Sequence, residues 1–238
     1  MRFLPAGDSG LILEFGNEIS EGINRQIKFV TDTLDEAKLP GVLDLVPTYR
    51  SILVSFDPLR ISATGIADIV TNSMHNFAAA EDASGGEVIE IPVLYGGDTG
   101  PDLDFIAHHT GLDREEVIRL HSSVEYLIYM IGFTPGFPYL GGMPKELTTP
   151  RLQKPRTLIP AGSVGIAAAQ TGIYSVESPG GWQLLGRTPV RIFDCEREQP
   201  FLLSAGQYLK FCPISEGEYA SIAQAAEDGA YHPRRYRK

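Results

Sequence analysis

The sequence has 238 residues, of which 43% are hydrophobic and 21% charged, a balance typical of globular domains that excludes a wholly disordered chain. Its 30 acidic residues outnumber 20 Lys and Arg, giving a net charge of −10. This balance argues against a nucleic-acid-binding protein, because phosphate contacts need clustered basic residues. The basic residues gather only at 234–238, which we interpret as a solvated tail.

The first third of the chain predicts a small α/β domain. Short apolar runs at 2–4 and 10–15 indicate strands. From Ile19 to Ala37, apolar residues recur every three or four positions, which predicts a helix that ends before Pro40-Gly41. Two further strands at 43–49 and 52–56 and a helix at 66–77 complete the order β-β-α-β-β-α. This order predicts helices packed on one face of a mainly antiparallel sheet.

A short segment of small and polar residues, 78–86, follows this domain. It contains no large apolar residue to bury, so we expect a linker between two separately folding units. The predicted organisation is an N-terminal α/β domain at 1–82 and a second domain at 88–238.

The second domain begins with a predicted strand at 88–95 and two short helices. Thr99 and Asp102 have the spacing of a capping box, with Pro101 in the first helical turn. Asp113 begins the other helix, which ends near His121. Beyond it, short apolar runs alternate with Gly and Pro, which predicts a β-barrel or sandwich. These runs are 125–131, 164–168, 172–176, 190–194 and 208–213.

The location of the protein follows from three absences in the sequence. The uncharged stretches 126–144 and 157–176 contain too many Pro and Gly residues for membrane spans, and no signal peptide is visible. Cys195 and Cys212 lack metal-ligand spacing and predict buried thiols in a reducing compartment. We therefore expect a cytoplasmic protein without a membrane partner.

No motif of a self-sufficient enzyme is present. The chain has no phosphate-binding loop, dinucleotide fingerprint, zinc-protease motif or nucleophile elbow, and no metal-ligand cluster. His121 is the one candidate for acid/base catalysis. Its place at a helix C-terminus, where the dipole favours the charged form, gives it a structural explanation as well. The catalytic residues stay unassigned.

The most informative segments are the Gly/Pro-rich loops at 129–142 and 178–187. Proline fixes φ and glycine permits positive φ, so such loops hold their aromatic side chains rigidly. These aromatics either fill a core or form a recognition surface with polar edges, and composition alone favours neither. On the second interpretation, the site residues converge on one end of the barrel. They are Phe133, Pro135, Phe137, Gln170, Tyr174, Trp182 and Arg187.

Long irregular motifs resemble the allophanate hydrolase subunit 1 family, which includes the B subunit of 5-oxoprolinase and a Kip-type sporulation kinase inhibitor. They read GFTPGFPYLGG (132–142), TPRLQKPRTLIPAGSVGIAAAQTGIY (149–174) and ESPGGWQLLGRTP (177–189). YGGDTGPDL (95–103), TGLDREEVIRLHS (110–122) and PTYRSILVSFDP (47–58) resemble the same family, so the resemblance covers nearly the whole chain.

The resemblance implies an α+β fold, with a small N-terminal α/β domain followed by a cyclophilin-like β-barrel. It implies one component of an ATP-dependent 5-oxoprolinase, a hydrolase that converts 5-oxoproline to glutamate, and a chain that is inactive alone. The implied partners are proteins like the A and C subunits of 5-oxoprolinase, the latter also called allophanate hydrolase subunit 2. ATP is expected at a partner protein, and no cofactor on this chain.

Other functions stay open as alternatives, two from the family and one from the likeness of the barrel to another fold. They are inhibition of a sporulation histidine kinase, the carboxyltransferase-type half of a urea carboxylase/allophanate hydrolase system and, ranked lowest, prolyl isomerase activity. One departure bears on the site. The family resemblance leads us to expect Ala-Gly-Asn-Gln before Thr171, whereas this chain has Ala168 and Ala169 in place of the Gly and Asn. If that position needs positive φ, Ala168 strains the site.

Overall fold

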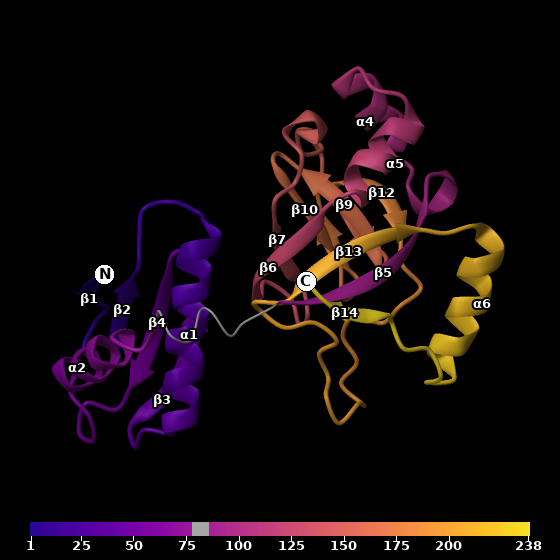
Figure 1. Cartoon of the computed structure of the whole chain (residues 1–238). Coiled ribbons are helices and arrows are strands. Elements are labelled where there is room, and N and C mark those ends of the chain that lie inside the picture. Colours follow the sequence, from indigo (N-terminus) through magenta and orange to yellow (C-terminus); the bar gives the residue numbers. More distant parts are fainter. Residues whose placement is uncertain (78–85) are drawn as a thin grey trace. The chain divides into compact units, whose positions relative to one another are not determined.

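The computed structural model describes residues 1–77 and 86–238 (Figure 1). The chain divides into two compact units, Met1–Gly85 and Gly86–Lys238. The linker predicted at 78–86 falls almost entirely outside the described residues. The predicted α+β class, a small α/β unit followed by a β-barrel unit, is confirmed by the elements that follow.

The first unit is a four-stranded antiparallel sheet with two helices on one face. Its strands are β1 (Arg2–Pro5), β2 (Gly10–Glu14), β3 (Val42–Pro47) and β4 (Ser51–Phe56), in the order β1-β2-β4-β3. In β2 and β4, buried residues alternate with partly buried ones, and the buried ones pack against α1 (Glu21–Ala37) and α2 (Ala63–Met74). The fully buried core of this unit comprises Leu13, Ile27, Val30, Ile52, Val54, Ile66 and Val70.

Both helices begin where a serine side chain caps them. Ser20 Oγ accepts a hydrogen bond from the N–H of Ile23, and Ser62 Oγ accepts one from Gly65. Ile19 therefore lies before α1 and is 56% exposed, which corrects its predicted place in the apolar stripe of the helix. The serine cap, and not the spacing of apolar residues, sets where the helix begins. The Ser20 hydroxyl accepts a hydrogen bond from a helical N–H that would otherwise have no partner, and the Ile19 side chain cannot.

The second unit is a nearly closed β-barrel (Figure 1). Its strand order is β10-β9-β12-β5-β13-β6-β7, and β10 and β7, at the two ends of this order, contact each other. The strands are β5 (Glu87–Tyr95), β6 (Glu125–Ile131), β7 (Pro138–Gly141), β9 (Ser163–Ala167), β10 (Gln170–Ile173), β12 (Gln183–Arg187) and β13 (Tyr208–Pro213). A separate two-stranded sheet joins β8 (Arg156–Ile159) to β11 (Ser178–Gly180).

The helices α4 (Leu103–Thr110) and α5 (Arg114–Ser122) lie together at one end of the barrel (Figure 1). Short 3-10 turns at Gly97–Thr99 and Lys145–Leu147 adjoin them. The predicted capping box at α4 is wrong. Thr99 Oγ1 donates to the carbonyls of Leu94 and Gly96. The Asp102 side chain makes no cap, because it accepts instead from Arg156 and from the N–H of Leu184. At α5, Asp113 does accept from the N–H of Glu116.

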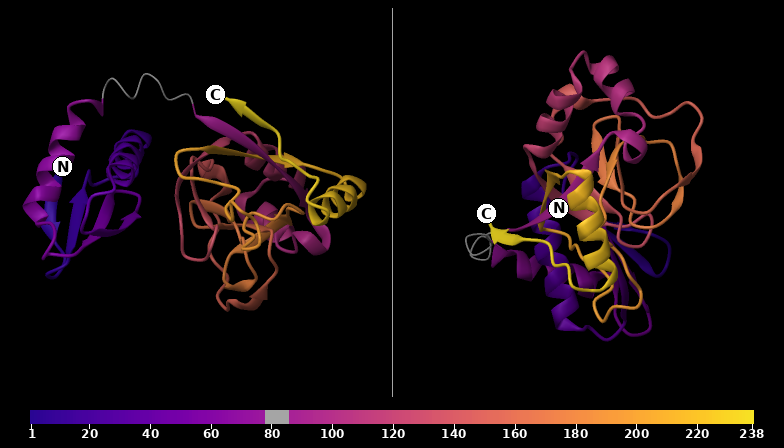
Figure 2. Two further views of the ribbon diagram at one scale, coloured as in Figure 1. Left: turned by 90° about the horizontal axis from the view of Figure 1, so that it is seen from below. Right: turned by 90° about the vertical axis from the view of Figure 1, so that its right-hand side faces the viewer.

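Two predictions in the last part of the chain need correction, and one helix there was not predicted. Residues 190–194 form no strand and contribute only an isolated bridge from Phe193 to Phe201. Helix α6 (Glu216–Glu227) was not predicted, because its small residues leave no buried side chain and therefore no apolar stripe. The helix packs outside the barrel beside β5 (Figure 2). Cys195 is exposed and Cys212 half-buried, so neither is a buried thiol as predicted.

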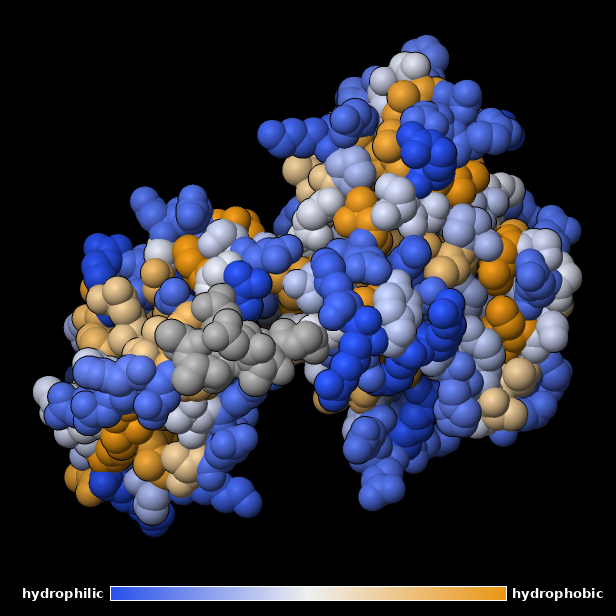
Figure 3. Space-filling view, viewed as in Figure 1, coloured by the Kyte–Doolittle hydropathy of each residue, from blue (hydrophilic) through white to orange (hydrophobic). Residues whose placement is uncertain are grey.

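The basic C-terminal residues are not a free tail. They form β14 (Arg235–Arg237), antiparallel to the first half of β5, and Figure 3 shows strongly hydrophilic residues over this strand. Arg235 pairs with Glu87, Arg234 with Glu90 and Lys238 with Glu125. The carboxylates of β5 and β6 thus offset this positive charge, and the sequence alone could not show that pairing.

Candidate functional site

Aromatic rings from three segments meet at a pocket of about 170 Å³ in the barrel unit. The Phe137 ring is at the centre and makes edge-to-face contacts with four other rings, with centroids 5.4–5.8 Å apart. The four rings belong to Phe133, Tyr139, Tyr174 and Trp182. This arrangement is the favoured geometry of aromatic side chains and is worth about 0.5–1.5 kcal/mol per pair beyond burial. The pocket is therefore rigid and apolar at its base.

The loop between β6 and β7 holds two of these rings by backbone constraint. Phe133 has φ +65° and Gly136 φ +79°, and the N–H of Phe137 bonds to the carbonyl of Thr134. A phenylalanine in the left-handed region is strained, which marks the loop as fixed by its surroundings. The loop therefore buries one ring and exposes the other, so that Phe137 is 3% exposed and Phe133 is 74% exposed.

Two glycines allow the rings to approach the backbone. A Cβ at Gly172 would lie 3.0 Å from Phe137 Cζ, and one at Gly180 would clash with the Tyr174 hydroxyl. These glycines explain part of the Gly-rich character of the motifs, since any side chain there would displace a pocket ring.

The pocket lining also includes polar side chains. Arg151 and Gln170 belong to it, together with the tyrosines Tyr139 and Tyr174. Burial raises the pKa of both Tyr174 and Tyr139 above the usual value, so both phenols stay protonated at neutral pH and can donate hydrogen bonds. The pocket can thus hold a small ring or one apolar side chain and bond to its polar edge. Its described lining contains no serine, cysteine or histidine that could act as a nucleophile or base.

A partly buried ion pair supports the backbone at Trp182. Asp102 Oδ1 accepts from Arg156 Nη2 at 2.7 Å, and its Oδ2 accepts from the N–H of Leu184 at 2.6 Å. Arg156 Nη1 also donates to the carbonyl of Trp182 at 3.3 Å. Asp102 therefore links α4, β8 and β12 and sets the position of the backbone that carries Trp182.

The structure brings together five of the seven predicted site residues. Phe133, Phe137, Gln170, Tyr174 and Trp182 line the aromatic pocket, whereas Pro135 and Arg187 do not. The carbonyl of Pro135 accepts from Ser175 Oγ at 2.6 Å, so Pro135 serves the loop conformation. Arg187 lines a second groove. Arg151 was not predicted as a site residue, although it lies in one of the family motifs.

His121, the catalytic candidate, lies fully buried in the barrel core. Tyr95 O–H donates to Nδ1 at 2.8 Å, and Nε2–H donates to Thr171 Oγ1 at 2.8 Å. This tautomer follows because the Thr171 hydroxyl donates its proton to the carbonyl of Gly165 and can therefore only accept from His121. Burial lowers the pKa of His121 to about 3. The expected charged form is therefore wrong, because desolvation outweighs the helix dipole.

Ala168 occupies the strained conformation that the sequence left open. It is the first of two turn residues between β9 and β10 and has φ +51°. Its N–H and carbonyl both bond to Thr149, at 2.7 and 3.2 Å, so the turn cannot easily relax.

We expect Ala168→Gly to raise the free energy of unfolding by about 1 kcal/mol, because glycine adopts positive φ without steric cost. Chemical denaturation measures this. Ala169→Gly is the matched control, since Ala169 has no positive φ, and it should be neutral or destabilising. Equal effects of the two substitutions would contradict strain at Ala168.

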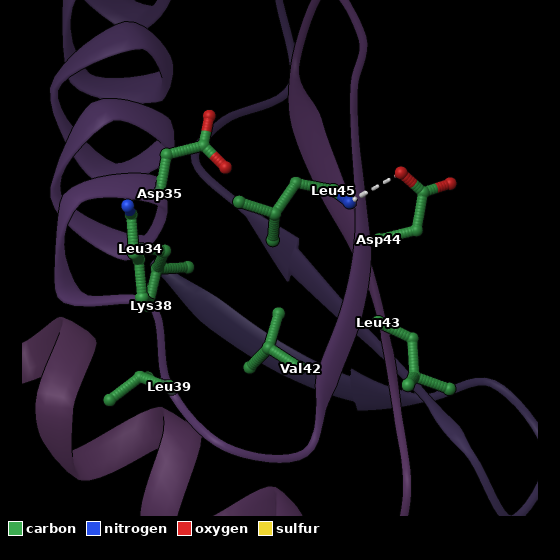
Figure 4. A pocket seen from close by; sticks show the side chains of 8 residues that line it. All are labelled: Leu34, Asp35, Lys38, Leu39, Val42, Leu43, Asp44 and Leu45. Atoms are coloured by element: carbon green, nitrogen blue, oxygen red, sulfur yellow. Dashed lines mark hydrogen bonds between the residues drawn. The ribbon is translucent and has the colours of Figure 1, made fainter.

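A hollow of about 510 Å³ lies in the first unit between the end of α1 and β3. Figure 4 shows Leu34, Val42 and Leu45 directed into the space between these elements, while Asp44 accepts from the N–H of Leu45 at 2.9 Å. None of the predicted site residues lines it. We interpret it as the seam between helix and edge strand.

Residues 1–77 and 86–238 contain no group of three or more His, Cys, Asp or Glu side chains placed to hold a metal ion. Over the same residues, no helix has the length and apolar character needed to cross a membrane.

Comparison with known proteins places the chain in a family. The carboxyltransferase domain family, subdomains C and D, matches residues 1–203. The chain is 42% identical to the B subunit of 5-oxoprolinase from Bacillus subtilis, over 90% of this chain and 92% of that one. It is 40% identical to the B subunit of 5-oxoprolinase from Escherichia coli O157:H7, over 89% and 95%.

Two solved structures are similar to this chain in fold. The protein TTHA0988 matches with a TM-score of 0.78 and 38% identity, over 87% of this chain and 40% of that longer chain. The Kluyveromyces lactis urea amidolyase matches with a TM-score of 0.75 at 21% identity, over 99% of this chain and 16% of that one, and at this identity it shows the fold alone. With the family match and relatives spanning nearly the whole chain, the protein belongs to the carboxyltransferase subdomain C and D family and is similar to the B subunits of 5-oxoprolinases.

Proposed function

We propose that this chain is the B subunit of an ATP-dependent 5-oxoprolinase, which cleaves 5-oxoproline to glutamate together with partner proteins. The observation that carries the proposal is the 40–42% identity to two proteins named as the B subunit of 5-oxoprolinase, each matched over about nine-tenths of both chains. A name of this kind implies a complex. We propose proteins like the A and C subunits of 5-oxoprolinase as the partners, with ATP bound by a partner.

The aromatic pocket supports this role in two ways. Its volume of about 170 Å³ suits a small five-membered ring or a single inserted side chain. Its exposed rim residue Phe133 offers an apolar contact to a partner, of the kind that interface centres favour. Because the pocket lining holds no nucleophile, we propose that a partner completes the reaction centre.

The test is a reconstitution assay that measures glutamate release with each protein omitted in turn. We expect release only from the full mixture. Release by this chain with ATP alone would contradict the shared site. No release from the full mixture would favour the kinase-inhibitor function, for which the exposed Phe133 would be the docking residue.

A matched pair of variants tests the pocket itself. Phe133→Ala should lower kcat/KM of the reconstituted complex about tenfold, the loss of roughly 1.4 kcal/mol of contact energy. Phe105, 47% exposed on α4 and outside the pocket, provides the control, and Phe105→Ala should leave activity unchanged. Both rings are exposed, so neither substitution should unfold the barrel. Equal activity of the two variants would remove the pocket from the proposed function.

A further inference from the structure

A second groove, of about 470 Å³, lies on the barrel unit between the segment that follows β10, the segment that follows β12 and helix α6. Its volume is within the usual range of sites for small molecules. Arg187, Arg191, Glu177, Glu227 and Tyr219 provide its polar lining. Small residues of α6, Ala223 and Ala226, form one wall and leave the space open.

Arg187 is the unusual member of this lining. Its Nε is buried and has no hydrogen-bond acceptor among the described residues, and no described carboxylate lies within ion-pair distance of its guanidinium. A buried N–H of an arginine is costly to leave without an acceptor. Arg191, in the same groove, differs, since its guanidinium is 3.5 Å from the Asp194 carboxylate.

The backbone around Arg187 fixes where its side chain begins. Arg187 is the last residue of β12 and pairs with Ser163 of β9. The next residue, Thr188, donates its N–H to the carbonyl of Gly162 at 2.9 Å, and a Cβ at Gly162 would lie 3.4 Å from Arg187 Cγ. The guanidinium at the end of this side chain is a planar set of donors, the arrangement that carboxylates match with two parallel hydrogen bonds.

We propose that Arg187 binds the carboxylate of a small organic acid in this groove, as a site separate from the aromatic pocket. The two sites use opposite sides of one segment, since Tyr174 lines the aromatic pocket and the adjacent Ser175 lines the groove. The exposed Glu177 and Glu227 bear on which acid binds, because a carboxylate at the rim attracts the ammonium group of an amino acid. All the candidate ligands contain a carboxylate, and the experiment below identifies which acid binds.

The experiment titrates the full chain with acetate, 5-oxoproline and L-glutamate and follows the ¹⁵N–¹H signal of Arg187 Nε by NMR. We expect this signal to shift in a saturable way with at least one of the two larger acids. Tighter binding of glutamate would identify an amino acid ligand, and tighter binding of 5-oxoproline a simple acid. An Nε signal that does not respond to any of the three would overturn the proposal.

Two variants locate the site by calorimetry with the acid that binds. Arg187→Gln should weaken binding at least tenfold, because the charged donors are lost. Arg119→Gln, which removes the same charge from an exposed side chain that lines neither the groove nor the aromatic pocket, should bind within twofold of the unchanged protein. Retention of binding in Arg187→Gln would overturn the proposal. If Arg187→Gln fails to fold, the NMR titration of the unchanged protein still tests whether Arg187 binds a carboxylate. Because this test uses no partner and no turnover, its failure is distinct from failure of the 5-oxoprolinase assay.

Discussion

Replacing Asp102 by alanine is expected to lower the free energy of unfolding of the barrel unit by about 3 kcal/mol. The residue is 9% exposed, and its carboxylate accepts from Arg156 and from the backbone of Leu184. Alanine would leave the Arg156 charge, 29% exposed, and a buried N–H without their acceptor. We expect a loss of stability at the lower end of the range for breaking buried ion pairs, because water reaches part of Arg156.

Asp104→Ala is the matched control. Asp104 pairs with Arg114, but both side chains are more than 60% exposed, so the loss should stay below about 1 kcal/mol. Urea denaturation of the full chain measures both variants. Fluorescence of Trp182, the only tryptophan, gives a second readout, because Arg156 also bonds to the Trp182 carbonyl. Equal losses in the two variants would show that the Asp102 pair has no special structural role.

The second large effect is a loss of folding stability at acidic pH. His121 has a pKa of about 3 in the folded protein, against about 6.5 in the unfolded chain. Between these values the unfolded state binds the extra proton, so stability falls as pH falls below 6.5 and is fully present above it. From pH 7 to pH 5, this one group should lower the free energy of unfolding by about 2 kcal/mol.

The measurement is urea denaturation at pH 7, 6 and 5. His121→Gln should flatten the loss over this range, because glutamine does not titrate, even if the variant is less stable throughout. His108→Gln, at an exposed position on α4, should keep the full slope. A slope in His121→Gln as steep as in the unchanged protein would assign the acid sensitivity to other groups.

The sequence by itself was sufficient for the elements whose local pattern agrees with their place in the fold. The alternating apolar residues of 52–56 became the central strand β4, and the run 125–131 became β6 with those bounds. Five aromatic and polar residues of the Gly/Pro-rich motifs do meet in one pocket, because proline and positive-φ glycine restrict a loop before any tertiary contact forms. Local sterics and periodicity carry that information.

What only the tertiary structure decided are the partners of polar groups that are distant in sequence. The spacing of Asp102 fits a helix cap, yet Leu184 and Arg156 bind its carboxylate from 82 and 54 residues away. Arg187 shares a motif with Trp182, but it lines a different groove. His121 ends a helix as predicted, and burial beside Thr171 makes it neutral. A hydrogen bond or a desolvated charge depends on which groups the fold brings within about 3 Å, and spacing along the chain does not specify that.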